Sequence, residues 1–367
     1  MQPSREEILK ALEGVIDPEL RRPITELDMV RDVRIDGGQV AVTIALTVAG
    51  CPLRASFQDQ VEAEVGSLAG VEAVSLDFDV MSHDEKAALT TKLRGGISER
   101  TEGISLDLST RVIAIASGKG GVGKSSLAAN LAAAFSSLGH RTGVLDADVY
   151  GHSIPHLLGI TQRPVVVDKM IVPPVRYLGP QVSDRSVKLM SIGFFLDDNQ
   201  PVMWRGPMLH RALEQFLSDV HWGELETLVV DMPPGTGDVS ISLGQLLPRA
   251  EAVVVTTPQP LAQEVAARAA IMAQKTNMRL IGVIENMSGD VFGSGGGAEL
   301  AARIGVPLLG TVPLDPRLRE CGDAGEPLVT SDPAAETARI ILGIAEEIAA
   351  TKREQGVGIV KALPVLS

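Results

Sequence analysis

Apolar and polar positions follow two different patterns along the chain. Near the start, the alternating stretch 40–47 predicts a strand, and apolar residues at helical spacing predict a helix over 53–68 that ends at Gly70. A second strand is expected at 71–80. Because the predicted helix has a complete apolar face, these elements can bury a core of their own. We therefore expect a small α/β domain over residues 1–83.

From residue 111 onward the pattern changes to short, wholly apolar runs separated by helical segments. Such runs are typical of strands that are buried on both faces of a sheet. They lie at 111–116, 143–145, 228–230, 252–256, 280–284 and 308–312. The alternation predicts an α/β domain over 111–367 with a doubly wound, mostly parallel sheet and ligands at the carboxyl ends of its strands. Residues 84–110 are more polar and lack a sustained period, so we interpret them as a linker.

The most informative motif follows the first of these apolar runs. Residues 117–126 read Ser-Gly-Lys-Gly-Gly-Val-Gly-Lys-Ser-Ser and match the phosphate-binding loop G-x-x-x-x-G-K-[ST]. A flexible glycine linker would have no reason to lie between a buried strand and a helix that points its N-terminus at a phosphate. The sequence therefore predicts an ATP-binding site. Its expected contacts are Gly118, Lys119, Gly120, Gly121, Val122, Gly123, Lys124, Ser125 and Ser126.

Within this loop, Lys124 is expected to reach the β- and γ-phosphates and Ser125 to hold Mg²⁺. A second Mg²⁺ ligand is predicted at Asp231, where the apolar run 228–230 ends and the sequence Met-Pro-Pro-Gly-Thr-Gly begins. This succession looks like a Walker-B strand that runs into a switch loop. Gly235 is expected to offer its N–H to the γ-phosphate. The alternative for Asp231 is an acid that caps an ordinary turn.

A lysine directly after the first glycine of the loop resembles the "deviant" loop of the MinD/ParA-like ATPases. The resemblance implies that Lys119 crosses to the nucleotide of a partner subunit in a homodimer, and that Asp148 orients the attacking water. It also implies that Asn286 recognises adenine and that Pro313 forms a wall of the same pocket. The alternatives are an exposed loop lysine, a solvated acid and ordinary turn residues at strand ends.

Nearly the whole chain resembles the Mrp/ApbC family of ATP-binding iron–sulfur cluster carriers. Residues 1–83 are similar to the SufT-like domain found at the front of many members, including Asp17-Pro-Glu19 and the Thr47-x-x-x-Cys51-Pro52 element. The stretch Val202–Met208 is similar to another segment typical of that family. The resemblance implies ATP hydrolysis in the assembly of iron–sulfur clusters or their delivery to apoproteins. The implied partners are assembly factors and client apoproteins.

The chain departs from that family in its cysteines. The Cys-x-x-Cys pair expected soon after Asn286 is absent, and the sequence continues directly into 289–297. In the family, such pairs from two subunits are thought to bridge a cluster. Only Cys51 and Cys321 remain, whereas a cluster normally needs about four thiolates. Cys51 is interpreted either as a transient thiolate ligand or as a buried structural thiol, and Cys321 as a helix-end thiol.

Composition narrows the remaining function classes. The chain has 367 residues, 45% of them apolar and 22% charged, which fits a globular protein of two domains. A net charge of −13 and an aromatic content of 3% argue against nucleic acid as a partner. The sequence shows neither a membrane-spanning stretch nor a signal peptide, so we expect a cytoplasmic protein with no membrane partner.

Three functions are therefore compared. The first is an ATP hydrolase of iron–sulfur cluster assembly or delivery. The second is a nucleotide-gated scaffold without its own cluster, because the Cys-x-x-Cys pair is missing. The third is a ParA/MinD-type positioning ATPase, which would need a basic face or an amphipathic membrane helix; the segment 356–367 contains glycine and proline and does not resemble such a helix.

Overall fold

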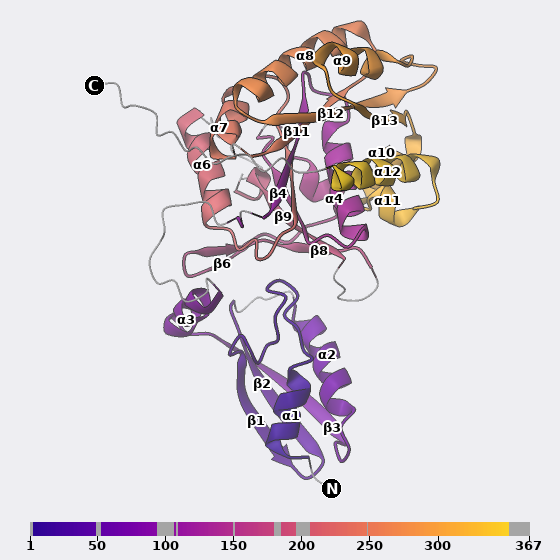
Figure 1. Cartoon of the computed structure of the whole chain (residues 1–367). Coiled ribbons are helices and arrows are strands. Elements are labelled where there is room, and N and C mark those ends of the chain that lie inside the picture. Colours follow the sequence, from indigo (N-terminus) through magenta and orange to yellow (C-terminus); the bar gives the residue numbers. More distant parts are fainter. Residues whose placement is uncertain are drawn as a thin grey trace, which may run out of the picture.

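The computed structural model describes residues 3–48, 53–93, 106–107, 109–149, 151–179, 185–195, 206–247 and 249–351. It consists of a small N-terminal α/β unit and a larger α/β unit that holds the phosphate-binding loop (Figure 1). No helix among these residues is long and apolar enough to cross a bilayer.

The N-terminal unit is a three-stranded sheet with two helices on one face. The strands are β1 (Val30–Asp36), β2 (Gln39–Leu46) and β3 (Ala73–Val80), in the order β1-β2-β3. β1 and β2 form an antiparallel pair, whereas β3 runs parallel to β2 after the crossover helix α2 (Arg54–Gly66). Helix α1 (Arg5–Leu12) begins with a capping box between Ser4 and Glu7. Alternate residues of β2 point toward both helices and form the core with them.

Helix α3 (His83–Leu93) extends this core to the larger unit. Its buried Leu89 and Leu93 belong to the same apolar cluster as the residues of the hairpin β6 (Val165–Val167) and β7 (Met170–Val172). The predicted linker 84–110 therefore begins inside a packed helix. The greater part of its remaining residues lies outside the described ranges.

The larger unit contains an eight-stranded sheet in the order β13-β12-β11-β4-β10-β5-β9-β8. All neighbouring strands are parallel except β8, which is antiparallel to β9 at the edge. The strands are β4 (Arg111–Ser117), β5 (Thr142–Asp146), β8 (Val175–Tyr177), β9 (Ser186–Ser191), β10 (Thr227–Asp231), β11 (Glu251–Thr256), β12 (Arg279–Ser288) and β13 (Leu308–Pro313). The predicted doubly wound, mostly parallel sheet is confirmed.

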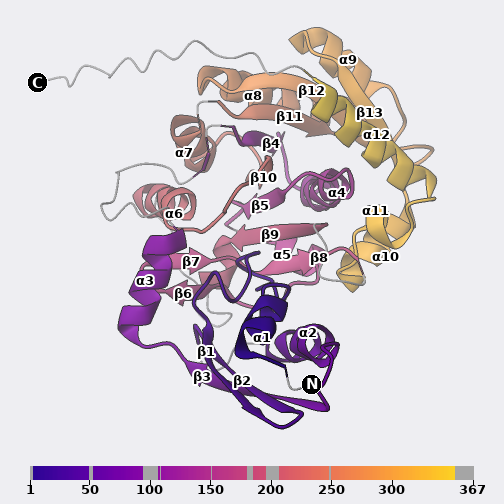
Figure 2. The ribbon, with the colours of Figure 1, turned by 60° about the horizontal axis from the view of Figure 1, so that its bottom comes forward.

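Helices cover both faces of this sheet (Figure 2). One face carries α4 (Lys124–Ser137), α5 (Ile154–Leu157), α10 (Pro316–Ala324), α11 (Leu328–Ser331) and α12 (Glu336–Ala350). The other carries α6 (Gly206–Ser218), α7 (Asp238–Leu246), α8 (Pro260–Lys275) and α9 (Gly296–Ile304). Because both faces are covered, the central strands are buried along their whole length, which explains the apolar run in the middle of each.

The strand order indicates where a ligand would bind. Strand β4 lies between β10 and β11, and the chain first builds outward on the β10 side before it returns to β11. At such a reversal the loops after neighbouring strands diverge and leave a crevice at the carboxyl ends. The phosphate-binding loop follows β4 at this point. The 3-10 helix η1 (Ile192–Phe195) follows β9 at the same edge.

Candidate active site

The loop after β4 has the backbone that a phosphate cradle requires. Gly121 and Gly123 have φ angles of +78° and +77°, a region that residues with a Cβ rarely adopt. A Cβ on Gly118 would overlap the backbone of Val265 in α8. No side chain caps the N-terminus of α4, so its first N–H groups face the loop. These groups can bind phosphate oxygens.

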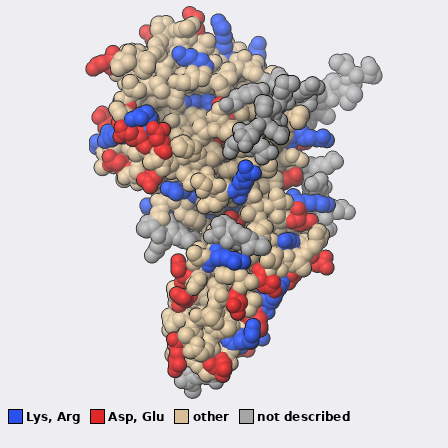
Figure 3. All heavy atoms as spheres, turned by 180° about the vertical axis from the view of Figure 1, so that it is seen from behind, with Lys and Arg blue, Asp and Glu red and all other residues tan. Residues whose placement is uncertain are grey.

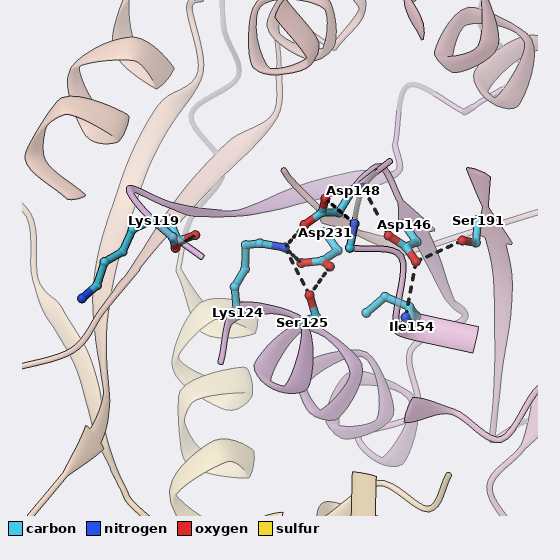
Figure 4. Close-up of polar contacts among 10 residues, drawn as sticks. Lys119, Lys124, Ser125, Asp146, Asp148, Ile154, Ser191 and Asp231 are labelled. Carbon is cyan, nitrogen blue, oxygen red and sulfur yellow. Dashed lines mark hydrogen bonds and ion pairs between the residues drawn. The ribbon is translucent and has the colours of Figure 1, made fainter. Parts of the chain in front are cut away.

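Four predicted residues converge beside this loop (Figure 4). Lys124 Nζ donates to Asp231 Oδ1 at 2.6 Å and lies 3.6 Å from Asp148 Oδ2. The Ser125 hydroxyl donates to Asp231 Oδ2 at 2.6 Å. Asp231 is completely buried, and burial raises the pKa of its carboxyl while Lys124 opposes the rise. The carboxylates of Asp231 and Asp148 thus both lie beside Lys124, and phosphate oxygens would have to replace its hydrogen bond to Asp231.

The same cluster has the chemistry of a magnesium site. Mg²⁺ prefers hard oxygen ligands, usually one or two carboxylates together with substrate phosphates. The hydroxyl of Ser125 and the carboxylate of Asp231 come from α4 and β10 and already face one another. These residues therefore fit Mg²⁺.

Asp146 organises the loop that carries Asp148. Its carboxylate accepts hydrogen bonds from the Asp148 N–H at 3.2 Å, the Ile154 N–H at 3.3 Å and the Ser191 hydroxyl at 3.0 Å. Burial, followed by the nearby charge of Asp231, raises the pKa of Asp146 to about 8. Ser191 was not predicted from the sequence. The available signal was a polar residue at the end of an apolar strand.

Two other predicted phosphate ligands lie outside this cluster. Lys119 is exposed, and its side chain points away from Lys124 and the acids (Figure 4). Gly235 has a φ angle of +89°, and its N–H donates to the Ser117 carbonyl at 2.8 Å. To reach a γ-phosphate, this N–H must exchange the carbonyl for a phosphate oxygen.

Asn286 lies directly beneath the phosphate-binding loop. It is 2% exposed, and its Nδ2 donates to the Val122 carbonyl at 2.8 Å. Its Oδ1 has no hydrogen-bond partner among the described residues. Because a buried acceptor without a partner is costly, this oxygen suits a ligand that carries an N–H donor. Pro313 ends β13 and is the register partner of Ser288, two residues after Asn286.

The neighbouring strand contributes two further polar atoms that the sequence reasoning missed. Thr257 Oγ1 and Gln259 Oε1, which follow β11, are buried and also lack partners within the described part of the chain. Polar residues directly after the apolar run 252–256 were the available signal.

The cysteines do not form a metal site in the described ranges. Cys321 is half-buried in α10 and accepts a hydrogen bond from the Ser331 hydroxyl at 3.3 Å. Cys51 and residues 202–205 of the predicted family segment lie outside those ranges. No group of three or more His, Cys, Asp or Glu residues placed to hold a metal occurs in the part of the chain that is described.

The segment that stands in place of the expected Cys-x-x-Cys is a tight turn. Gly289 and Gly293 exchange backbone hydrogen bonds of 2.9 and 2.7 Å. The carboxylate of Glu285 then accepts hydrogen bonds from the N–H groups of Gly295 and Gly297 and so caps α9. Val291, in the turn, is 73% exposed.

Charges of both signs are interspersed over the face seen in Figure 3. Lysine and arginine do not form a continuous stripe among the atoms described on that face. This face therefore does not offer the broad basic surface that electrostatic binding to nucleic acid requires.

Comparisons with known proteins agree with this geometry. The model of the NUBPL iron-transfer P-loop NTPase family matches residues 109–349, and that of the iron-sulfur cluster assembly protein family matches residues 5–76. The chain is 48% identical over 360 residues to the iron-sulfur cluster carrier protein of Mycobacterium leprae (strain TN), covering 94% of this chain and 92% of the relative. It is 40% identical over 321 residues to that of Bacillus subtilis (strain 168), covering 84% and 88%.

Among solved structures, the chain is similar to a nucleotide-binding protein in complex with ADP from Archaeoglobus fulgidus. The TM-score is 0.51 at 35% identity, covering 59% of this chain and 86% of that one. The cell division ATPase MinD of Pyrococcus furiosus shares the fold, with a TM-score of 0.50 at 24% identity and coverage of 65% and 98%. The predicted resemblance is confirmed: the chain belongs to the NUBPL iron-transfer P-loop NTPase family and carries an N-terminal domain of the iron-sulfur cluster assembly type.

Proposed function

We propose that this protein binds ATP with Mg²⁺, hydrolyses it, and uses the turnover in the assembly of iron–sulfur clusters or their delivery to apoproteins. The convergence of Lys124, Ser125, Asp148 and Asp231 at the carboxyl ends of β4, β5 and β10 carries the proposal. The relatives named iron-sulfur cluster carrier protein support the second part.

The roles of the residues follow from their placement. Lys124 exchanges its hydrogen bond to Asp231 for the β- and γ-phosphate oxygens, and Ser125 with Asp231 holds Mg²⁺. The ion supplies charge neutralisation on those oxygens. Asp148, the carboxylate that remains beside Lys124, orients the attacking water. Asn286 Oδ1 accepts a hydrogen bond from the adenine amino group, and Pro313 borders the base.

Lys119 acts from a second copy of the chain in this proposal. Its side chain is exposed and points away from the cluster of its own subunit, so it does not complete that cluster (Figure 4). A homodimer closed over two nucleotides would place each Lys119 against transferring phosphoryl oxygens, where a cation stabilises developing charge. Assembly factors and client apoproteins are the further proposed partners.

A nucleotide-gated scaffold without its own cluster is the second candidate. The turn between Gly289 and Gly293 favours it, because the backbone closes on itself where the family's thiolate pair is expected. In either case the cluster is cargo that the protein passes on or helps others to assemble.

Phosphate release from ATP tests the first part of the proposal. The purified chain should release phosphate in the presence of Mg²⁺, and Lys124→Ala should abolish the release. Lys275→Ala, which changes an exposed lysine at the end of α8, is the matched control and should behave like wild type. Equal loss in both variants, or phosphate release by Lys124→Ala at the wild-type rate, contradicts the assignment.

A further inference from the structure

The N-terminal unit contacts the edge of the large sheet through the loop that contains Asp17-Pro-Glu19. The hydroxyl of Tyr177 donates to the Pro18 carbonyl. The guanidinium of Arg21 donates to the hydroxyl of Ser186. Tyr177 and Ser186 face one another as register partners in β8 and β9. One short loop therefore contacts both the end of β8 and the start of β9.

This loop is rigid enough to act as a fixed contact. The Asp17 carboxylate accepts hydrogen bonds from the N–H groups of Glu19 and Leu20 at 2.8 and 2.9 Å, and the Asp17 carbonyl accepts from the Arg21 N–H at 2.7 Å. Arg21 has a φ angle of +56°, in the left-handed region that residues with a Cβ rarely adopt. Asp17 is only 5% exposed, so its carboxylate serves the loop and is not free to bind a metal.

Strand β9 connects this contact to the nucleotide site. Its first residue, Ser186, bonds Arg21, and its last residue, Ser191, donates to the Asp146 carboxylate at 3.0 Å. The strand is buried throughout and pairs with β5 from Val187 to Ser191, with Ser191 opposite Asp146. A strand of this length spans roughly 17 Å. It is therefore a stiff link between the N-terminal unit and the loop of Asp148.

We propose that the docked N-terminal domain holds β9 in place and thereby positions Asp146 and Asp148, so that ATP turnover depends on domain docking. The inference rests on the proposed ATP hydrolysis at the phosphate-binding loop. Arg21, Tyr177 and Ser191 are positioning residues, since none of them touches the nucleotide cluster itself. Domain docking lowers the activation barrier of hydrolysis by fixing Asp148, the acid that orients the water. This effect stabilises the transition state and leaves the binding of ATP nearly unchanged.

The test uses the full chain in two variants that cut the link at opposite ends. Arg21→Ala combined with Tyr177→Phe removes the contacts to Ser186 and Pro18, and Ser191→Ala removes the contact at Asp146. Each should lower kcat about fivefold or more while the Kd for ATP changes less than about twofold. Ser191→Thr keeps the hydroxyl and should restore kcat. Arg34→Ala, an exposed arginine of β1 that bonds only Asp32 among the described contacts, is the matched control.

Hydrogen exchange of backbone amides shows whether loss of the domain contact loosens β9 and the loop of Asp148. In Arg21→Ala/Tyr177→Phe, amides of 186–191 and 146–149 should exchange faster, and the Arg34→Ala control should not change. Faster exchange with unchanged kcat overturns the coupling, as does unchanged exchange at 186–191. Loss of ATP affinity equal to the loss in kcat also overturns it, because docking would then act on binding. If wild type itself releases no phosphate, the proposed function fails, and this result is distinct from all of the others.

Discussion

Asn286 lies directly against Gly123, so that a Cβ on residue 123 would overlap the Asn286 amide. The contact joins the residue proposed to read the base to the loop proposed to hold the phosphates. The Nδ2 group fixes the loop at Val122, while Oδ1 is left for the ligand. Base recognition and phosphate binding should therefore change together when either residue is altered.

Asn286→Ala should weaken ATP binding about tenfold, because both the bond to Val122 and the bond to the base are lost. Asn286→Asp keeps the oxygen acceptor but removes the Nδ2 donor. It should therefore retain part of the affinity for ATP, and it should lose less of its selectivity for ATP over GTP than Asn286→Ala does. Calorimetric titrations with ATP, with GTP and with both in competition measure the affinity and the selectivity. Unchanged affinity in the alanine variant would exclude Asn286 from the site.

Lys124→Ala and Lys119→Ala should separate binding from hydrolysis. Lys124 lies inside the cluster, so its removal should lower ATP affinity by about 100-fold. Lys119 points outward, so its removal should leave affinity largely intact and abolish phosphate release. Equal losses of affinity in the two variants would contradict the proposal that Lys119 acts on the nucleotide of a partner subunit.

Asp148→Asn should bind ATP and Mg²⁺ normally but turn over about 100-fold more slowly. The amide keeps the size of the side chain and removes the charge that orients the water. Dimer should accumulate with ATP, which sedimentation can detect. Asp290→Asn, in the exposed turn after β12, provides a control. Wild-type turnover by Asp148→Asn at saturating ATP would reject the role.

Glu19 and Lys188, near the contact between the two units, should make the folded chain least stable near neutral pH. Burial raises the pKa of Glu19 from 4.5 to about 7, so the unfolded chain releases this proton first and stability falls as the pH rises between these values. Burial lowers the pKa of Lys188 from 10.5 to about 7, so the unfolded chain takes up this proton first and stability falls as the pH drops between these values.

Thermal unfolding at about pH 5, 7 and 9 measures both sides of this minimum. Lys188→Met should raise the unfolding temperature at pH 5 and pH 7 more than at pH 9 and so flatten the alkaline side, and Glu19→Gln should flatten the acid side. Glu62→Gln, an exposed acid of α2, should leave the profile as it is in wild type. A parallel shift of the whole profile in Lys188→Met would contradict the assignment.

Iron–sulfur reconstitution should give a weak cluster or none. Cys321 is half-buried beside Ser331, and the described residues contain no further cysteine. A stable cluster normally needs about four thiolates. The measurement is iron counting and optical spectra after anaerobic reconstitution and chelation. A chelator-resistant cluster that disappears in Cys51→Ser or Cys321→Ser would establish an unconventional carrier site and reject the scaffold candidate.

Local sequence was sufficient for the parts of the site that lie on one strand-loop-helix unit. Gly121 and Gly123 are glycines because their φ angles are positive, and that requirement is visible in the motif. The doubly wound sheet was predictable for a similar reason, since burial on both faces leaves an apolar run in each strand. The clustering of Lys124 with Asp231 followed from the rule that carboxyl ends of parallel strands meet.

Contacts between distant segments were not predictable in this way. Arg21 and Ser186 are separated by 165 positions, and neither belongs to a pattern that names its partner. The sequence pattern does not distinguish Ser191 from other serines, because its role depends on the pairing of β9 with β5. The packing of α3 against the hairpin of β6 and β7 was also not predictable, because its two buried leucines are equally compatible with either unit.

Glu285 and Asn286 are neighbours in β12 that hold different structures. Glu285 fixes the start of α9, and Asn286 fixes the phosphate-binding loop. The turn between Gly289 and Gly293 follows both residues in the chain and lies outside the hydrogen bonds that their side chains make. Replacement of this turn by a segment of different length or chemistry should therefore leave the hydrogen bonds of Glu285 and Asn286 in place.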